Sequence, residues 1–334
     1  MRRYFLAIPV MLTVATGCDN VTWGGTAVEV RDPPPRAELV ADAPGLAASL
    51  EAEDTRPEFP TGPILLAGTR SGSEATLYVV GEVRGGTLAE LPDETSSPGF
   101  RDYFTQELLS PGSEWTLFSQ GVRVGRLIAT TVGINESFCV ARPTVTGTVE
   151  LVPSASTATR LMALPAAATA GRSYGEYSTH SDDYDDRVGS LALATGEIPR
   201  VGAAWPPEGV LTIRKNIQVL QFVDAPGRAI AATFVLADRL AVAPPQLGAY
   251  SLFVIGTQQT DDYQLAFSWY RPADTEGKGV PRFFDHLDWD GDGSEEILLD
   301  VFGAESRWFA GLTQRDGDWI RSYQDSCGQA SAGG

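Results

Sequence analysis

Basic residues are scarce in this chain of 334 residues. Lysine occurs only at Lys215 and Lys278, and the formal net charge is −18. Nucleic-acid binding depends on a cluster of positive charge that meets the phosphates, so this composition argues against a nucleic-acid partner. Histidine occurs only at His180 and His286, which argues against a histidine-based zinc centre. The sequence also lacks the glycine-rich motifs that bind phosphate between a strand and a helix.

Glycine and proline are plentiful by contrast, with 35 and 22 copies, and hydrophobic residues make up 43% of the chain. This combination predicts a hydrophobic core inside a loop-rich, mainly β fold. We expect an antiparallel β-meander in a propeller-like or sandwich arrangement, with one or two short helices. The expected helix covers residues 100–109, and the expected strands cover residues 64–67, 75–83, two segments within 115–132, 144–152, 210–213, 218–223, 229–236, 250–255, 263–270, 307–313 and 319–323.

The N-terminal apolar stretch, residues 4–15, is too short to form a stable membrane span. It follows the basic Met1-Arg2-Arg3 and precedes small residues, which is typical of a secretory signal peptide. Residues 15–18, Ala-Thr-Gly-Cys, resemble the lipobox of bacterial lipoproteins. The resemblance implies that residues 1–17 are removed, that Cys18 is diacylated, and that the protein is anchored to a membrane of the cell envelope, on the periplasmic or surface side. Ordinary signal cleavage, with Cys18 lost or incidental, is the alternative.

Residues 18–63 have little hydrophobic periodicity and include proline-rich stretches at 32–35 and 56–60. Such a segment cannot bury enough apolar surface to fold alone, so we expect a disordered tether that lifts the folded part away from the lipid. Residues 64–328 are expected to form the mainly β domain, and residues 329–334 a frayed tail.

The strongest chemical motif is the acidic, glycine-rich stretch at residues 288–296, which reads DWDGDGSEE. Its alternating aspartates can converge on one side of a tight turn, because the glycines permit the backbone angles of that turn. A ligand set made only of oxygens favours Ca²⁺ over zinc or copper. The alternative is an acidic hairpin turn with no bound ion. The predicted ligands are the side chains of Asp288, Asp290, Asp292 and Glu296 and the main-chain carbonyl of Ser294.

The flanking sequence indicates the kind of calcium loop. An EF-hand loop has a bidentate glutamate at its twelfth position, where this chain has Leu299. Both flanks are short and rich in strand-forming residues, so the loop is expected to join two strands. The pattern Asp-x-Asp-Gly-Asp-Gly-x-x-Glu before a hydrophobic strand resembles the calcium loops of FG-GAP/VCBS-type β-propeller repeats. The resemblance covers residues 281–302 in one copy and implies that the side chains of Asp288, Asp290, Asp292 and Glu296 are ligands.

Two cysteines, Cys139 and Cys327, remain if Cys18 carries lipid. An exported chain meets an oxidising compartment in many bacteria, so we expect a disulfide between them. This bridge would tie the end of the β region to its first half. The alternative is two separate thiols.

Two further stretches contain candidate catalytic or binding residues. Residues 171–175 match the letters of Gly-x-Ser-x-Gly, the nucleophile elbow of α/β-hydrolases, with Ser173 as the nucleophile and His286 as a triad partner. That elbow requires a strand before it and a helix after it, and neither flank has a suitable composition. The acidic stretch at residues 180–186 is expected to be a solvated loop, with a further cation site or a partner contact as the alternative.

These observations favour a role without catalysis. They predict a lipid-anchored cell-envelope protein whose Ca²⁺-stabilised β domain has a binding or structural role, with a protein or a glycan as its ligand. The alternative function is an extracytoplasmic serine hydrolase that uses Ser173.

Overall fold

The computed structural model describes residues 59–91, 98–170, 175–223, 227–260 and 262–328. These residues fall within the unit Thr55–Gly334. Several predicted features lie outside the described residues, namely the signal peptide at residues 1–17, Cys18, most of the tether, Ser173 and the tail at residues 329–334. The side chain of Cys327 lies outside them as well.

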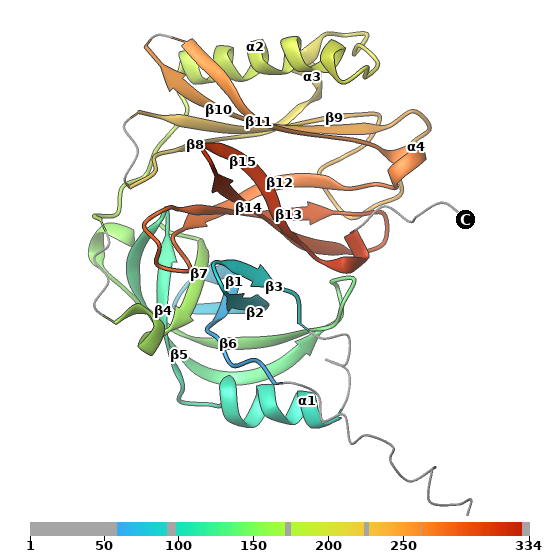
Figure 1. Cartoon of the computed structure of the whole chain (residues 1–334). Helices are drawn as coiled ribbons and strands as arrows, with labels where there is room; N and C mark the ends of the chain where they lie inside the picture. The colour runs from blue at the N-terminus through green and yellow to red at the C-terminus, as the bar shows by residue number, and fades with distance from the viewer. Residues whose placement is uncertain (1–58, 92–97, 171–174, 224–226, 261, 329–334) are drawn as a thin grey trace, which may run out of the picture. The chain divides into compact units, whose positions relative to one another are not determined.

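The first half of the described chain forms a closed, six-stranded antiparallel barrel (Figure 1). Its strands follow the order β1-β7-β4-β5-β6-β2, and β2 pairs with β1 to close the ring. Closure leaves no unpaired strand edge around the barrel. A short strand, β3 (Thr87–Ala89), pairs with β2 outside the ring. The barrel strands are β1 (Ile64–Ser71), β2 (Glu74–Arg84), β4 (Glu114–Ser119), β5 (Val122–Asn135), β6 (Arg142–Leu151) and β7 (Arg160–Pro165).

A short helical segment covers one end of the barrel (Figure 1). It consists of α1 (Pro98–Asp102) and a π-helical turn (Tyr103–Leu108), and it coincides with the helix predicted at residues 100–109. Phe100 and Phe104 are fully buried in the same hydrophobic cluster as the barrel interior. Their burial explains why this segment packs against the barrel although it is too short to be a stable helix alone.

The second half forms two four-stranded antiparallel meanders, each with its strands in chain order. Meander A contains β8–β11 and meander B contains β12–β15. In β13, six of seven residues are buried, because this strand is covered on both faces. Burial on both faces explains why apolar residues follow one another at positions 297–299 instead of alternating. The strands are β8 (Arg214–Leu220), β9 (Ala229–Leu236), β10 (Tyr250–Gln259), β11 (Asp262–Pro272), β12 (Val280–Leu287), β13 (Glu296–Phe302), β14 (Arg307–Arg315) and β15 (Asp318–Gln324).

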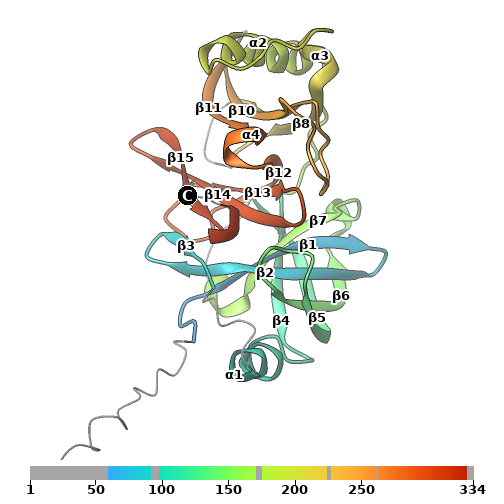
Figure 2. The ribbon, with the colours of Figure 1, turned by 90° about the vertical axis from the view of Figure 1, so that its right-hand side faces the viewer.

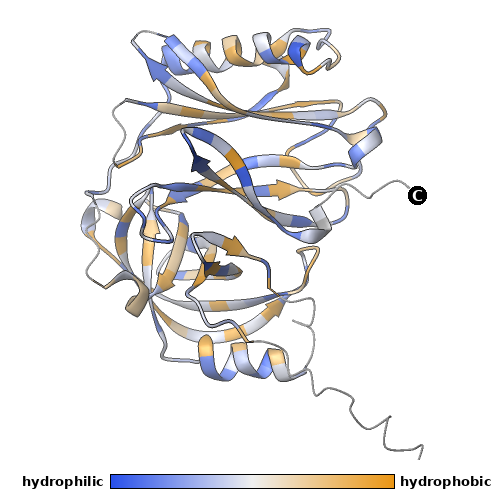
Figure 3. Ribbon diagram, in the orientation of Figure 1, coloured by the Kyte–Doolittle hydropathy of each residue, from blue (hydrophilic) through white to orange (hydrophobic). Residues whose placement is uncertain are grey.

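Within this unit the elements pack in layers, which Figures 1 and 2 show from two directions. α2 (Tyr184–Arg200) and the single turn α3 (Val210–Ile213) cover the outer face of meander A. The inner faces of the two meanders pack together, and the other face of meander B packs on the barrel. Figure 3 shows hydrophobic residues along the strands that form these contacts. A short helix, α4 (Ala273–Glu276), joins β11 to β12.

The mainly β, antiparallel fold predicted from the sequence is confirmed. The two meanders stack face to face as in a sandwich, and the described residues contain no ring of propeller blades. Two local predictions were wrong. The strand expected at residues 210–213 is the helical turn α3, and the acidic stretch at residues 180–186, expected to be a solvated loop, contains the start of α2. In addition, β7 was not predicted.

Candidate metal centre

The predicted calcium loop joins β12 to β13, as its strand-like flanks indicated. Gly291 and Gly293 have φ angles of 85° and 94°, which glycine adopts without strain. Between the acidic positions, Trp289 is fully buried in the hydrophobic cluster that joins meander B to the barrel. The indole of Trp289 therefore anchors the loop in the core, and the loop differs in this respect from a free surface turn.

Three of the predicted ligands converge. Oxygens of Asp288, Asp290 and Glu296 all lie within 4.8 Å of one another. Glu296 is buried, with 3% of its surface exposed, and the two aspartates are partly buried. Such a set of carboxylate oxygens around one point has the chemistry that a hard divalent cation such as Ca²⁺ prefers.

Asp292, the fourth predicted side-chain ligand, does not join this group. Asp292 is exposed, and its Oδ1 accepts a hydrogen bond from the main-chain N–H of Ser294 at 2.7 Å. The structure therefore places the loop between two strands and brings three of its four predicted side-chain ligands to one point.

Main-chain N–H groups hold the converging carboxylates in place. Asp288 accepts from Gly291 N at 2.5 Å and from Gly293 N at 3.2 Å. Asp290 Oδ1 accepts from the N–H of Asp292 at 3.1 Å, and Glu296 Oε2 accepts from the N–H of Trp289 at 3.1 Å. The loop backbone thus orients these oxygens through its own turns.

The electrostatics of the group favour a bound cation. Burial raises the pKa of Glu296 to about 9, and the charge of Asp290 adds to this effect. Burial also raises the pKa of Asp290, as do the charges of Asp292 and Asp288. A divalent cation would remove this repulsion, and its binding would release the proton held by Glu296.

Next to the metal loop lies a buried polar cluster that the sequence did not reveal. Glu295 Oε1 lies 2.9 Å from His286 Nδ1, and Glu295 Oε2 accepts from Val223 N at 2.5 Å. Asp285 accepts from the N–H of Gln120 at 3.0 Å. These contacts join meander B to meander A and to the β4–β5 turn of the barrel. The available signal was the presence of two adjacent polar residues, Asp285 and His286, between the apolar residues Phe284 and Leu287 of the strand.

The hydrolase alternative gains no support from the described residues. Ser173 itself lies outside them, but the segment before it ends in a 3-10 turn, Ala166–Thr169, and among the described residues after it the first helix begins at Tyr184. His286 is fully buried, and its Nδ1 lies beside Glu295. The described residues on either side of Ser173 therefore do not form the strand and the helix that a nucleophile elbow requires.

The acidic stretch at residues 180–186 is only partly the solvated loop that we expected. Asp183 is the N-cap of α2 and forms a capping box with Asp186. Asp186 is 2% exposed and accepts from Tyr263 Oη at 2.5 Å and from Arg228 Nη2 at 2.7 Å. Burial and this hydrogen bond raise the pKa of Tyr263. The buried part of the stretch therefore attaches α2 to meander A.

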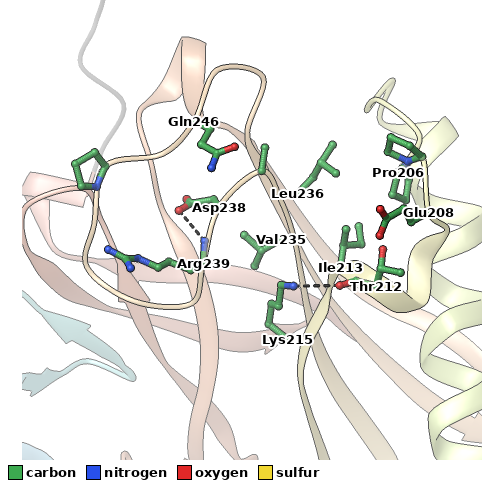
Figure 4. A pocket seen from close by; sticks show the side chains of 13 residues that line it. Pro206, Glu208, Thr212, Ile213, Lys215, Val235, Leu236, Asp238, Arg239 and Gln246 are labelled. Atoms are coloured by element: carbon green, nitrogen blue, oxygen red, sulfur yellow. Dashed lines mark hydrogen bonds between the residues drawn. The ribbon is translucent and has the colours of Figure 1, made fainter.

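A cavity of about 670 Å³ lies beside α3 and the loop that follows β9 (Figure 4). Its charged side chains do not converge, since Arg239 and Glu208 lie on opposite sides of it (Figure 4). Lys215 Nζ donates to a main-chain carbonyl at 3.0 Å, and Asp238 accepts from Lys278 at 2.8 Å. This cavity therefore presents no set of polar groups aimed at one ligand.

Comparisons with protein-family models, curated proteins and solved structures give no match to this chain. Among the described residues, no helix has the length and apolar character needed to cross a membrane.

Proposed function

We propose that this chain is a lipid-anchored protein of the bacterial cell envelope, with a β body that Ca²⁺ stabilises and that binds a protein or a glycan. The single observation that carries the calcium part is the convergence of Asp288, Asp290 and Glu296 within 4.8 Å. The lipid anchor rests on the sequence around Cys18.

A structural role for the cation follows from the position of the loop. Trp289 packs in the cluster between meander B and the barrel. On the barrel side, the β2–β3 turn approaches so closely that a Cβ atom on Gly86 would lie 3.2 Å from Asp290 Oδ2. A cation that orders this loop would therefore also stabilise the contact between meander B and the barrel.

Thermal unfolding with and without calcium tests this proposal. A ligand that binds only the folded state adds about 2.7 kcal/mol of stability when its free concentration is 100 times its Kd. We therefore expect the Tm to fall by several degrees when a chelator removes Ca²⁺. An Asp290→Asn variant should lose this response, whereas Asp318→Asn, at an exposed position of the same meander, should keep it. A wild-type Tm that is insensitive to Ca²⁺ would refute the calcium site.

Labelling with radioactive palmitate tests the anchor separately. In a bacterial host, the label should enter the wild-type chain and should be absent from a Cys18→Ala variant. Equal labelling of the two proteins, or none of the wild type, would end the lipoprotein part of the proposal and leave the calcium part untouched.

A further inference from the structure

A second, smaller cavity lies where the barrel, meander A and the segment before α2 meet. Its volume is about 170 Å³, which is below the range of drug-sized ligand pockets, roughly 300–1,000 Å³. The barrel contributes Gln120 from the β4–β5 turn and Arg160 from β7, meander A contributes Gln218, and the segment before α2 contributes Thr179 and His180. Sites that small ligands occupy are commonly found between such units of structure.

The charge of the residues that line this cavity is opposite in sign to the net charge of the whole chain. The whole chain has 43 acidic and 25 basic residues. None of the ten residues that line the cavity is acidic, and five of them carry a hydroxyl group. Arg160 supplies a fixed positive charge. Burial and the charge of Arg228 lower the pKa of His180, so its imidazole is neutral at pH 7 and acts as a hydrogen-bond partner.

The guanidinium of Arg160 is held in place by neutral groups. Its Nη1 donates to the main-chain carbonyl of Phe283 at 2.7 Å, and its Nη2 donates to Gln218 Oε1 at 2.8 Å. The acid whose charge acts on Arg160 most strongly is Asp285, which is 1% exposed and accepts from the N–H groups of Gln120 and His286. The two acceptors that orient the guanidinium are therefore neutral, and the acids whose charges act on it, Asp285 and Asp300, do not line the cavity.

We propose that this cavity binds a small oxyanionic group, which is a carboxylate, a phosphate or a sulfate, with Arg160 as its charged anchor. The planar guanidinium favours the oxygen geometry of such groups, and the surrounding hydroxyls supply further donors. The volume admits one such group, either as a free anion or as the substituent of a sugar that extends into solvent. This inference does not depend on the calcium site.

Isothermal titration of the full chain with sodium phosphate, sulfate and acetate tests the proposal, and glucuronate and glucose 6-phosphate distinguish a free anion from a sugar substituent. The wild type should bind at least one of these probes. Replacing Arg160 with Gln should weaken binding about tenfold or more, because a charge-assisted hydrogen bond is lost. Arg123→Gln, at an exposed position of the barrel strand β5, should leave the affinity within about twofold.

A second pair of variants tests the proposal independently if the Arg160→Gln protein does not fold. Thr179 is exposed at the rim of the cavity. Thr179→Glu places a negative charge there and should weaken binding about tenfold or more by repulsion, whereas Thr179→Gln should bind like the wild type.

Three outcomes would overturn the assignment. The first is that the wild type binds no probe up to roughly 10 mM. The second is that both the Arg160→Gln and the Thr179→Glu proteins bind as the wild type does, which would indicate an adventitious ion only. The third is that binding requires Ca²⁺ and disappears in Asp290→Asn, which would place the anion on the metal instead of in this cavity.

Discussion

Glu296 is the residue of the loop at positions 288–296 through which the stability of the metal-free protein depends on pH. It is almost completely buried, and burial together with the neighbouring aspartates raises its pKa from 4.5 to about 9 in the absence of metal. The folded protein therefore binds more protons than the unfolded chain between these two values. The free energy of unfolding of the metal-free protein must then decrease as the pH rises through this window.

We predict that the Tm of the calcium-free protein falls between about pH 5 and about pH 8.5, and that Glu296→Gln removes most of this dependence. Saturating Ca²⁺ should also remove it in the wild type, because the cation replaces the proton. Calorimetry across this range measures the effect. Glu74→Gln, which changes an exposed glutamate of β2, should keep the wild-type slope. A calcium-free Tm that stays constant or rises over this range would contradict the role of Glu296.

At the scale of the element, polar contacts stabilise α2, although the sequence of its first turn was expected to form a loop. Its first turn is acidic, and its buried face contains Asp186 as well as apolar residues such as Leu193 and Ile198. Asp186 contacts the cap residue Asp183 and also reaches Arg228 and Tyr263 in meander A. The same carboxylate therefore caps the N-terminus of the helix and attaches it to the sheet.

We expect Asp186→Ala to lower the free energy of unfolding by about 2 kcal/mol, because it removes the acceptor of the Tyr263 hydroxyl and one of the acceptors of Arg228. Asp185→Ala, which alters the exposed neighbour in the same turn, is the matched control and should have a much smaller effect. Urea unfolding of both variants measures the difference. Equal effects of the two substitutions would show that Asp186 contributes only helix capping charge.

At the scale of the whole described unit, the barrel and meander B are joined by a buried ion pair. Arg142 of β6 pairs with Asp325, which follows β15, and both side chains are almost completely buried. Arg142 Nη1 also donates to the carbonyls of Val79 and Val80 in β2. Tyr323 Oη donates to the Val80 carbonyl at 2.8 Å. One network therefore connects three strands that lie far apart in the sequence.

Removing one member of this pair should be more damaging than removing both. We predict that Asp325→Asn lowers the free energy of unfolding by about 3–5 kcal/mol, because the Arg142 cation is left buried without a counter-ion. The double variant Arg142→Met, Asp325→Leu should be clearly more stable than the sum of the single effects implies. Asp318→Asn serves as the exposed control in β15. Additive effects in denaturant unfolding would contradict a coupled pair.

The Cys139–Cys327 disulfide stays a prediction at this scale. The main-chain N–H of Cys139 donates to the carbonyl of Arg307 at 3.0 Å, and Gly328 lies against the indole of Trp308. The chain neighbours of both cysteines thus meet at the start of β14. We expect a cross-linked peptide pair in non-reducing mass spectrometry, and a loss of about 4–5 kcal/mol on reduction in the chain-entropy model. Free thiols at both positions under oxidising conditions would exclude the bridge.

What the sequence determined by itself is local. The acidic turn at residues 288–296 and the strands on either side of it were predicted because a glycine-bearing turn and an apolar run depend on neighbouring residues only. The same holds for the helical segment at residues 100–109 and for the hairpin that ends in β15. The strand predicted at residues 210–213 failed because a short stretch with three apolar residues suits a buried strand and a buried helical turn equally well.

Only the tertiary structure decided which of these segments meet. Closure of the barrel through β1 and β2, the stacking of the two meanders and the pairing of Arg142 with Asp325 all join positions that are distant in the chain. The same is true of the cavity around Arg160. Such contacts depend on the register and packing of whole sheets, which no local pattern encodes, so the sequence could indicate the metal loop but not the core that surrounds it.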